Sequence, residues 1–359
     1  MAMEEEIRKI EEEISSTSYN KATEKHVSML KAKLARLKEQ SLVKHGTKQA
    51  VGFFVKKTGD ATVLLVGMPS AGKSTLINAM TNAESKTAAY EFTTLDVIPG
   101  MLEYRNAFIQ ILDIPGIIEG ASRGKGEGRK VMSAARVADL VIIMLDPARG
   151  LEGQHEMIAK ELYSSGFRLD QQKPSIRLAK KTSGGVNISC DPSMDRKSIE
   201  AILKEFKIMS ADIVIRGKLT SEQFIDFLMG NRIYVPSITV INKSDIAGKR
   251  PANGEKAGWI YISALKKQNL EALKEAIWSR LAFSRIYLKR IGLPADMRKP
   301  LIIKGSCAIE DVCKKIHADF ARYFRYARVW GKSAKFGGQK VGLRHILQDG
   351  DVVELHSRK

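Results

Sequence analysis

The chain has 359 residues, of which 44% are hydrophobic and 28% are charged. This ordinary globular composition excludes a disordered or fibrous protein, and the length predicts two or three domains. Lys and Arg number 59 against 40 Asp and Glu, and this net charge of +19 favours a polyanionic partner such as nucleic acid or a membrane surface. Residues 284–359 alone carry 17 basic and 7 acidic side chains, which is over half of the excess.

The N-terminus is acidic, whereas a signal peptide begins basic and then becomes apolar. Apolar runs such as 140–145 are far shorter than the ~18 residues that cross a bilayer. Cys190, Cys307 and Cys313 are at no metal-ligand spacing, so we expect reduced, buried thiols. These features predict a cytoplasmic protein with no membrane partner.

Residues 4–42 contain no Pro or Gly and predict a helical hairpin, interrupted by cap-type residues at 15–20. One apolar stripe recurs at helical spacing along both halves: Ile7, Ile10 and Ile14, then Leu30, Leu34 and Leu37. The stripe must bury against the rest of this chain, which we expect, or against a partner.

From residue 51 the pattern changes to strands separated by helical segments. Strand-like runs cover 53–55, 62–66, 108–112, 140–145, 238–241 and 259–262, with a turn signal at 58–60. This alternation predicts an α/β fold, a parallel sheet with helices on both faces.

About ninety residues separate the strand ending at Leu145 from the one beginning near Ile238, far more than one crossover helix needs. Strands at 175–178, 186–189 and 212–216 and helices at 198–206 and 221–228 indicate an inserted α+β domain. Strands at 301–303, 327–330 and 352–355 and a helix at 309–320 predict a small α+β domain at the C-terminus. We expect four domains made of five segments: the hairpin 1–50, the parallel-sheet domain 51–164 and 233–283, the insert 165–232, and the C-terminal domain 284–359.

Residues 67–74, Gly-Met-Pro-Ser-Ala-Gly-Lys-Ser, fit the phosphate-binding loop pattern between a strand and a helix. Glycines let backbone N–H groups point at phosphates, and the following helix offers them its N-terminal dipole. Lys73 would reach the β- and γ-phosphates, and the Ser74 hydroxyl would ligate Mg²⁺. The expected nucleotide contacts here are Gly67, Pro69, Ser70, Ala71, Gly72, Lys73, Ser74 and Thr75.

The segment Asn242-Lys-Ser-Asp245 follows the strand 238–241 and favours guanine. The Asp245 carboxylate can accept hydrogen bonds from the guanine N1–H and 2-amino group, where adenine has no donors. Lys243 can lay its stem along the base, and Asn242 can tie this loop to the phosphate loop. Ser263-Ala264, after the strand 259–262, can place a backbone N–H on the guanine carbonyl oxygen. We therefore expect GTP and GDP as ligands.

Asp113 follows the strand 108–112 and can hold Mg²⁺ through a water, and the Gly116 N–H can sense the γ-phosphate. Thr94 is the candidate for a second Mg²⁺-ligating hydroxyl; Thr93 is adjacent, and a plain strand entry is the alternative reading of both. A loop that loses its γ-phosphate contact on hydrolysis makes a switch. Lys73, Thr94 and Gly116 are the expected catalytic residues.

The residues after Gly116 contain no Gln to orient the attacking water, because Ile117 and Ile118 stand there. The group must come from a partner or from a nearby residue, or hydrolysis is slow; the nearby candidates are Glu119, Arg123 and Arg129. Ser70 stands where some potassium-activated GTPases carry Asn, so activation by K⁺ is an open alternative.

Aromatic and basic residues interleave in 320–330. Arg322, Arg325 and Arg328 recur every three residues and could follow phosphates, with Tyr323 or Tyr326 stacking on bases. The alternative is that the aromatic rings fill a small core and the charges form a solvated face.

The order of these parts resembles the developmentally regulated GTP-binding proteins, relatives of the Obg GTPases, over essentially the whole chain. The similar segments are 20–26 and 30–37 in the helical region, 90–95 and 120–125 in the two switches, 223–226 and 230–232 in the insert, and 329–335 in the TGS domain. The resemblance implies a β-grasp fold for the TGS domain and, for the insert, a fold seen in a small-subunit ribosomal protein.

The resemblance also implies Mg²⁺-dependent GTP hydrolysis in the cytoplasm and work with translating ribosomes; in eukaryotic relatives a partner protein stabilises the GTPase. The prediction is therefore a P-loop GTPase switch that acts with ribosomes or structured RNA, and no DNA partner is expected. Two alternatives are a constitutive RNA- or ribosome-binding scaffold in which nucleotide is mainly structural, and an ATP-dependent enzyme.

Overall fold

The computed structural model describes residues 2–18, 20–44, 58–81, 98–113, 137–190, 194–246 and 258–357. The chain divides into two compact units: one comprises 1–53, 119–136 and 160–234, and the other comprises 54–118, 137–159 and 235–359. Within the described ranges, no helix combines the length and the apolar composition that crossing a bilayer requires.

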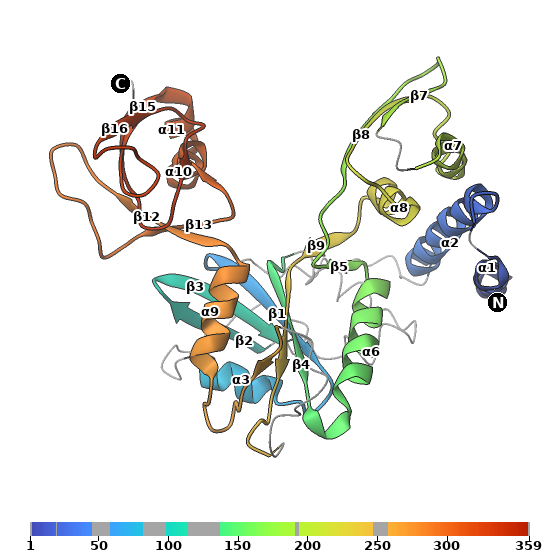
Figure 1. The fold of residues 1–359 in the computed structure, drawn as a ribbon, viewed down its shortest axis with the longest axis horizontal. Helices are drawn as coiled ribbons and strands as arrows, with labels where there is room; N and C mark the ends of the chain where they lie inside the picture. Colours follow the sequence, from blue (N-terminus) through green and yellow to red (C-terminus); the bar gives the residue numbers. More distant parts are fainter. Residues whose placement is uncertain are drawn as a thin grey trace. The chain divides into compact units, whose positions relative to one another are not determined.

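The second unit contains a six-stranded sheet in the order β11-β10-β4-β1-β3-β2. Its strands are β1 Ala61–Gly67, β2 Ile98–Tyr104, β3 Ala107–Asp113, β4 Leu140–Leu145, β10 Ser237–Ile241 and β11 Ile260–Tyr261. Figure 1 shows α3 (Lys73–Met80) and α9 (Leu270–Arg280) on one face and α6 (Leu151–Ser164) on the other. Because both faces are covered, β1, β4 and β10 are buried along their whole length, which explains their continuous apolar runs.

Strand β2 is the exception to the predicted parallel arrangement, because it pairs antiparallel with β3 at the edge of the sheet. It includes Pro99, which has no N–H for a ladder and is tolerated at sheet edges. The turn between the two strands places Arg105 and Asn106 at φ 50° and 66°, the left-handed pair of a tight hairpin. The sequence analysis did not find β2, since neither Pro within the run nor Arg-Asn in the turn is a strong hairpin signal.

A second sheet in this unit, in the order β13-β12-β18-β15-β16, belongs to the C-terminal domain. Its strands are β12 Phe283–Leu288, β13 Leu301–Lys304, β15 Phe324–Trp330, β16 Gln339–Val341 and β18 Val352–Ser357, with a separate pair of β14 Cys307–Ala308 and β17 Ile346–Leu347. The helix predicted at 309–320 is wrong at one point: His317, at φ −165° and ψ 142°, separates α10 (Ile309–Ile316) from α11 (Ala318–Tyr323). Val312 and Cys313 of α10 share a buried core with Ala327 and Val329 of β15.

The first unit contains the N-terminal hairpin and the insert. The hairpin is α1 Ala2–Ser16 and α2 Glu24–Lys44, as the helical spacing predicted. The insert has β6 Ser175–Lys180, β8 Ala211–Arg216 and β7 Val186–Cys190 in one three-stranded sheet, with helices α7 Arg196–Glu205 and α8 Ser221–Met229 and a strand pair of β5 Phe167–Leu169 and β9 Ile233–Val235. The strands and helices predicted within the insert are all present.

Helix α2 packs on the insert, but through a face other than the predicted apolar stripe. Of that stripe, Ile10 and Leu30 are buried, and the other four residues are half-buried. Ala32 is fully buried in a core with Ile202 and Phe224 of the insert. Arg36 pairs with Glu205 at 2.9 Å and Lys31 with Glu222 at 2.7 Å.

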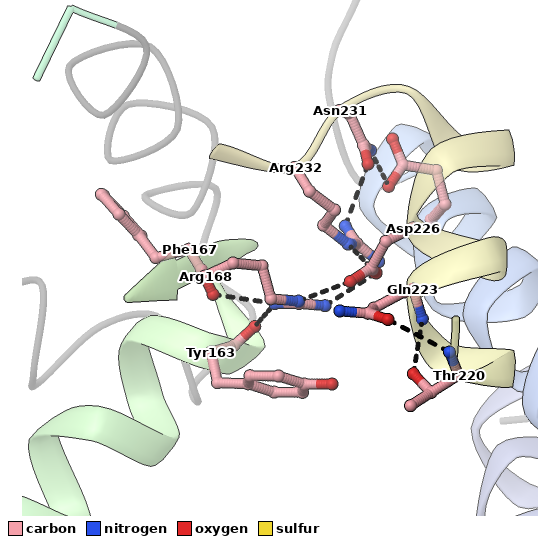
Figure 2. Close-up of polar contacts among 9 residues, drawn as sticks. Tyr163, Phe167, Arg168, Thr220, Gln223, Asp226, Asn231 and Arg232 are labelled. Atoms are coloured by element: carbon pink, nitrogen blue, oxygen red, sulfur yellow. Dashed lines mark hydrogen bonds and ion pairs between the residues drawn. The ribbon is translucent and has the colours of Figure 1, made fainter. Parts of the chain in front are cut away.

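A buried ion pair between Arg168 and Asp226 joins β5 to α8 (Figure 2). Their side chains are 5% and 6% exposed, and the contact is bidentate, with Nε–Oδ2 at 2.5 Å and Nη2–Oδ1 at 2.8 Å. Arg168 Nη1 donates to the carbonyls of Tyr163 and Phe167, and the Tyr163 ring centroid lies 3.7 Å from its Cζ. Arg232 Nε donates to Asp226 Oδ1 at 2.9 Å, so the buried carboxylate has two cationic partners. This saturation of donors and acceptors is what makes a buried ion pair tolerable.

Candidate nucleotide-binding site

The described site residues lie at the carboxyl ends of parallel strands. Strand β1 leads into the loop 67–74, β3 ends at Asp113, and β4, β10 and β11 are followed by Asp146, Asn242 and Ile262-Ser263 respectively. Open α/β sheets bind their ligands at this edge, so segments far apart in the sequence form one site.

The side chain of Lys73 bonds to the backbone of the phosphate loop. Lys73 Nζ donates to the carbonyl oxygens of Gly67 and Met68 at 3.1 and 3.3 Å, and its amine therefore lies across the loop. Gly72 has φ +94°, and a Cβ there would lie 2.3 Å from Asn242 Nδ2. A Cβ on Gly67 would lie 2.6 Å from the Met144 carbonyl oxygen. Gly67 is thus required by close packing, and Gly72 by close packing and by its positive φ.

Asn242 ties the base-recognition loop to the phosphate loop, as the motif predicted. It is 3% exposed, and its Nδ2 donates to the Ala71 carbonyl at 2.8 Å. Its Oδ1 accepts from the Ala264 N–H at 2.9 Å. The Ser263 N–H donates to the Gln268 carbonyl at 3.3 Å, so both N–H groups of the segment Ser263-Ala264 have acceptors within the protein. The next N–H along the chain, that of Leu265, has no acceptor within the described part of the molecule.

Asp245 is held as an ionised carboxylate. A hydrogen bond from Ser263 lowers the pKa of Asp245, and the charge of Lys266, whose Nζ lies 3.7 Å away, acts in the same direction. At neutral pH the side chain is therefore only an acceptor, which suits the two donors on the guanine edge.

Lys243 forms an ion pair that sequence reasoning missed. Its Nζ lies 2.7 Å from Asp146 Oδ2, while Asp146 Oδ1 accepts from the Ala148 N–H at 3.0 Å and so caps the short helix η1 Pro147–Arg149. Burial raises the pKa of Asp146, but the hydrogen bonds from Lys243 and Ala148 outweigh it and leave the pKa lowered. Gln154 of α6 fixes the backbone of Asp146, donating to its carbonyl at 2.6 Å and accepting from its N–H at 3.2 Å. A signal for Asp146 was available, since it directly follows a predicted strand, as Asp113 does.

The pair Ser74 and Asp113 suits a hard divalent cation. Ser74 Oγ lies 3.4 Å from Asp113 Oδ2, and Asp113 is 6% exposed. Among the residues that the structure describes, nothing bonds to Asp113 Oδ1, although that oxygen is buried. Burial raises the pKa of Asp113, and the charge of Lys73 opposes this shift. A buried carboxylate oxygen without a partner, next to a hydroxyl, fits the oxygen ligands that Mg²⁺ prefers.

Several predicted residues lie outside the described ranges. They are Thr94 and Gly116, with the adjacent Thr93 and the candidates for orienting water, Ile117, Ile118, Glu119, Arg123 and Arg129.

Comparison with known proteins agrees with this site. Residues 62–181 match the family model of the 50S ribosome-binding GTPases, residues 183–283 match the C-terminal region of that GTPase domain, and residues 284–357 match the TGS domain. An uncharacterized GTP-binding protein of Methanocaldococcus jannaschii is 50% identical, with 99% of this chain and 93% of the relative covered. Developmentally-regulated GTP-binding protein 2 of Homo sapiens is 42% identical, and GTP-binding protein 1 of Schizosaccharomyces pombe is 46% identical, each with 99% of both chains covered. This chain therefore belongs to the developmentally regulated GTP-binding proteins, and it is a GTP-binding P-loop GTPase with a C-terminal TGS domain.

Proposed function

We propose that this GTPase is a molecular switch that acts with ribosomes or structured RNA in translation. The observation that carries the proposal is the joining, in one chain, of a guanine-nucleotide site to a C-terminal domain with 17 basic and 7 acidic residues. The name of the matched family, which refers to 50S ribosome binding, supports the same partner. A strongly basic surface attracts RNA through its phosphates, and a GTPase site can make such binding depend on the nucleotide.

In this proposal the phosphates of GTP lie in the loop 67–74. Lys73 exchanges its two loop carbonyls for the β- and γ-phosphates, because a phosphate is a stronger acceptor than a carbonyl. The other phosphate contacts come from the loop and the start of α3: Gly67, Pro69, Ser70, Ala71, Gly72, Ser74 and Thr75.

The base lies between the loops after β10 and β11. Asp245 accepts from the guanine N1–H and 2-amino group, and the stem of Lys243 covers one face of the base. The guanine carbonyl takes the N–H of Leu265, next to the segment Ser263-Ala264, since the Ala264 N–H is already donated to Asn242.

A Mg²⁺ ion would be held by Ser74 directly and by Asp113 through a water, with Thr94 as a second hydroxyl. When bound, the ion neutralises charge on the β- and γ-phosphates. Thr94 and the Gly116 N–H would then respond to the γ-phosphate and release when it is lost.

Phosphate release from GTP, measured with and without ribosomes, tests the switch. We expect ribosomes to accelerate hydrolysis by the wild-type chain at least tenfold and to have no such effect on Lys73→Ala. A constitutive scaffold predicts a different result when ribosome binding is measured in the presence of GTP: Lys73→Ala then binds ribosomes as tightly as the wild type.

A further inference from the structure

The three larger sheets differ in how their edge strands are protected. Natural edge strands avoid pairing with another chain by being short or by carrying Pro or charged side chains. Strand β2 contains Pro99, β11 has only two residues, and β6, β13 and β16 carry the cations Arg177, Lys304 and Lys340 respectively. The remaining edge strand, β7 of the insert, has the sequence Val-Asn-Ile-Ser-Cys and none of these devices.

The outer side of β7 carries backbone groups that the sheet does not use. Val186 is paired with Ala211 of β8 in parallel register, and the Ala211 N–H donates to the Gly185 carbonyl at 3.1 Å. Since alternate residues of a parallel strand bond to the same neighbour, the backbone groups of Asn187 bond to β8 and those of Val186 and Ile188 point to the open side. On that side, no described residue bonds to the N–H or the carbonyl of Ile188.

Helix α7 lies next to β7 and forms a groove with it (Figure 1). Arg196 Nη2 of α7 donates to the Val186 carbonyl at 3.2 Å, so this carbonyl already attracts a donor from across the groove. The groove contains a cavity of about 250 Å³ that is lined by Val186, Glu200, Lys204, Ile208 and Met209. Pockets that hold small molecules typically have about 300–1,000 Å³, so this cavity suits a single side chain.

The lining of the cavity indicates which side chains it would accept. Ile208 is 9% exposed, and Met209 is 65% exposed and has the flexible thioether that adapts to different apolar partners. Glu200 is paired with Arg196 at 3.0 Å, whereas Lys204 is exposed and has no ion pair with any residue that the structure describes. An apolar side chain with an acidic neighbour therefore complements the groove.

We infer that β7 and α7 form a docking groove for an extended segment of another protein, which adds to the sheet as a further strand. An apolar side chain of the segment enters the cavity, and an acidic side chain next to it pairs with Lys204. In this mode of recognition the backbone hydrogen bonds give affinity and the pocket gives specificity. An extended segment supplies partners for the free groups of Val186 and Ile188, which a phosphate on Lys204 alone would leave unused. The inference goes beyond the proposed function and does not depend on it.

A defined peptide and the full-length protein test the groove. The probe is fluorescein-Ser-Glu-Val-Glu-Leu-Glu-Ser-amide, and its fluorescence anisotropy reports binding. We expect a Kd below about 100 µM, and binding at least about tenfold weaker when lysine replaces each glutamate. Two further peptides have N-methyl groups on one or the other alternate set of backbone amides. One set should abolish binding and the other should be tolerated, because only alternate N–H groups of an added strand face β7.

Three variants of the protein locate the site. Lys204→Glu should weaken binding at least about tenfold, since attraction becomes repulsion. The matched control, Lys180→Glu, changes an exposed lysine of the opposite edge strand β6 that also lacks an ion pair with any described residue, and it should bind as the wild type. Ile188→Pro should abolish binding, because Pro removes an N–H of the open side, where Pro is tolerated.

Hydrogen exchange separates loss of the groove from loss of the fold. The peptide should protect the amides of Val186–Cys190 in the wild type, and the β8 amides should exchange at the wild-type rate in each variant. If Ile188→Pro accelerates exchange in β8, Lys204→Glu and the N-methylated peptides decide the question.

Four results would overturn the inference: no binding of the probe at about 1 mM, equal binding of the glutamate and lysine peptides, tolerance of both N-methylated sets, and equal losses in Lys204→Glu and Lys180→Glu. Displacement of the peptide by a uridine single strand would also overturn it, since that result assigns the groove to RNA. None of these results bears on whether ribosome binding depends on GTP, so the proposed function is tested separately.

Discussion

Lys243 and Asp146, from the loops after β10 and β4, are joined by an ion pair with Nζ and Oδ2 2.7 Å apart. The pair holds the lysine of the base-recognition loop before any nucleotide is bound, and Gln154 holds the aspartate through its backbone. A side chain that is positioned in advance loses less conformational freedom when the ligand arrives. This arrangement predicts that Asp146 positions Lys243 for guanine binding.

Two substitutions of Asp146 test its contact with Lys243 and its contact with the Ala148 N–H separately. Asp146→Asn can still accept from the Ala148 N–H but loses the charge that holds Lys243, so we expect the Kd for GDP to rise about fivefold. Asp146→Ala also removes the cap of η1 and should weaken binding further. Titration with fluorescent GDP, together with the off-rate of that nucleotide, measures the effect of both substitutions. Affinities for Asp146→Asn equal to the wild type would show that the ion pair does not position Lys243.

Asp245→Asn should change which base is accepted. The amide replaces an acceptor by a donor, which repels the guanine 2-amino group and matches the 2-carbonyl of xanthine. We expect a loss of at least a hundredfold in GDP affinity and a gain of xanthosine diphosphate binding, measured by competition with ADP as a control. An unchanged choice of base would instead support the ATP-dependent alternative.

Removal of Mg²⁺ should weaken nucleotide binding, and this effect should depend on Ser74, the proposed direct ligand of the ion. In the wild type, EDTA should accelerate GDP release at least tenfold, because the phosphates lose their neutralising ion. Ser74→Ala should release GDP rapidly with or without EDTA, since the direct ligand is missing. A Ser74→Ala variant that keeps the full response to EDTA would contradict the assignment of this hydroxyl to the metal.

The buried pair Arg168 and Asp226 should matter far more to stability than an exposed pair in the same insert. Removing one partner by Arg168→Met leaves a buried carboxylate undercompensated, at a cost of about 3 kcal/mol or more. Hydrogen exchange of the amides of β8 and α8 should accelerate by about a hundredfold. The matched control is Arg196→Met, whose pair with Glu200 has side chains 64% and 41% exposed and should contribute little. Similar exchange in the two variants would rule out a structural role for the buried pair.

The sequence predicted the strands of the central sheet because strands buried on both faces are continuous apolar runs. The two elements that the sequence analysis predicted wrongly or missed have local causes. Strand β2 contains Pro99, and the break between α10 and α11 falls at His317, where neither Gly nor Pro marks it. Tertiary contacts outweigh propensity at such positions.

The candidate site was predictable where local motifs carry it. The phosphate loop and the Asn242–Asp245 segment bind through backbone groups and a few fixed side chains, so their spacing is visible in the sequence. Asp146 could have been found from its place after a strand. Gln154 could not, because its role depends on α6 folding back onto the loop after β4.

Co-sedimentation of the purified protein with ribosomes, across a salt series and with GDP or a non-hydrolysable GTP analogue, tests the central claim most directly. A GTP switch directed to ribosomes should pellet with the analogue at physiological salt and remain in the supernatant with GDP. Binding that ignores the nucleotide, or that disappears at modest salt for both nucleotides, would contradict the switch and reduce the charge of +19 to a non-specific attraction.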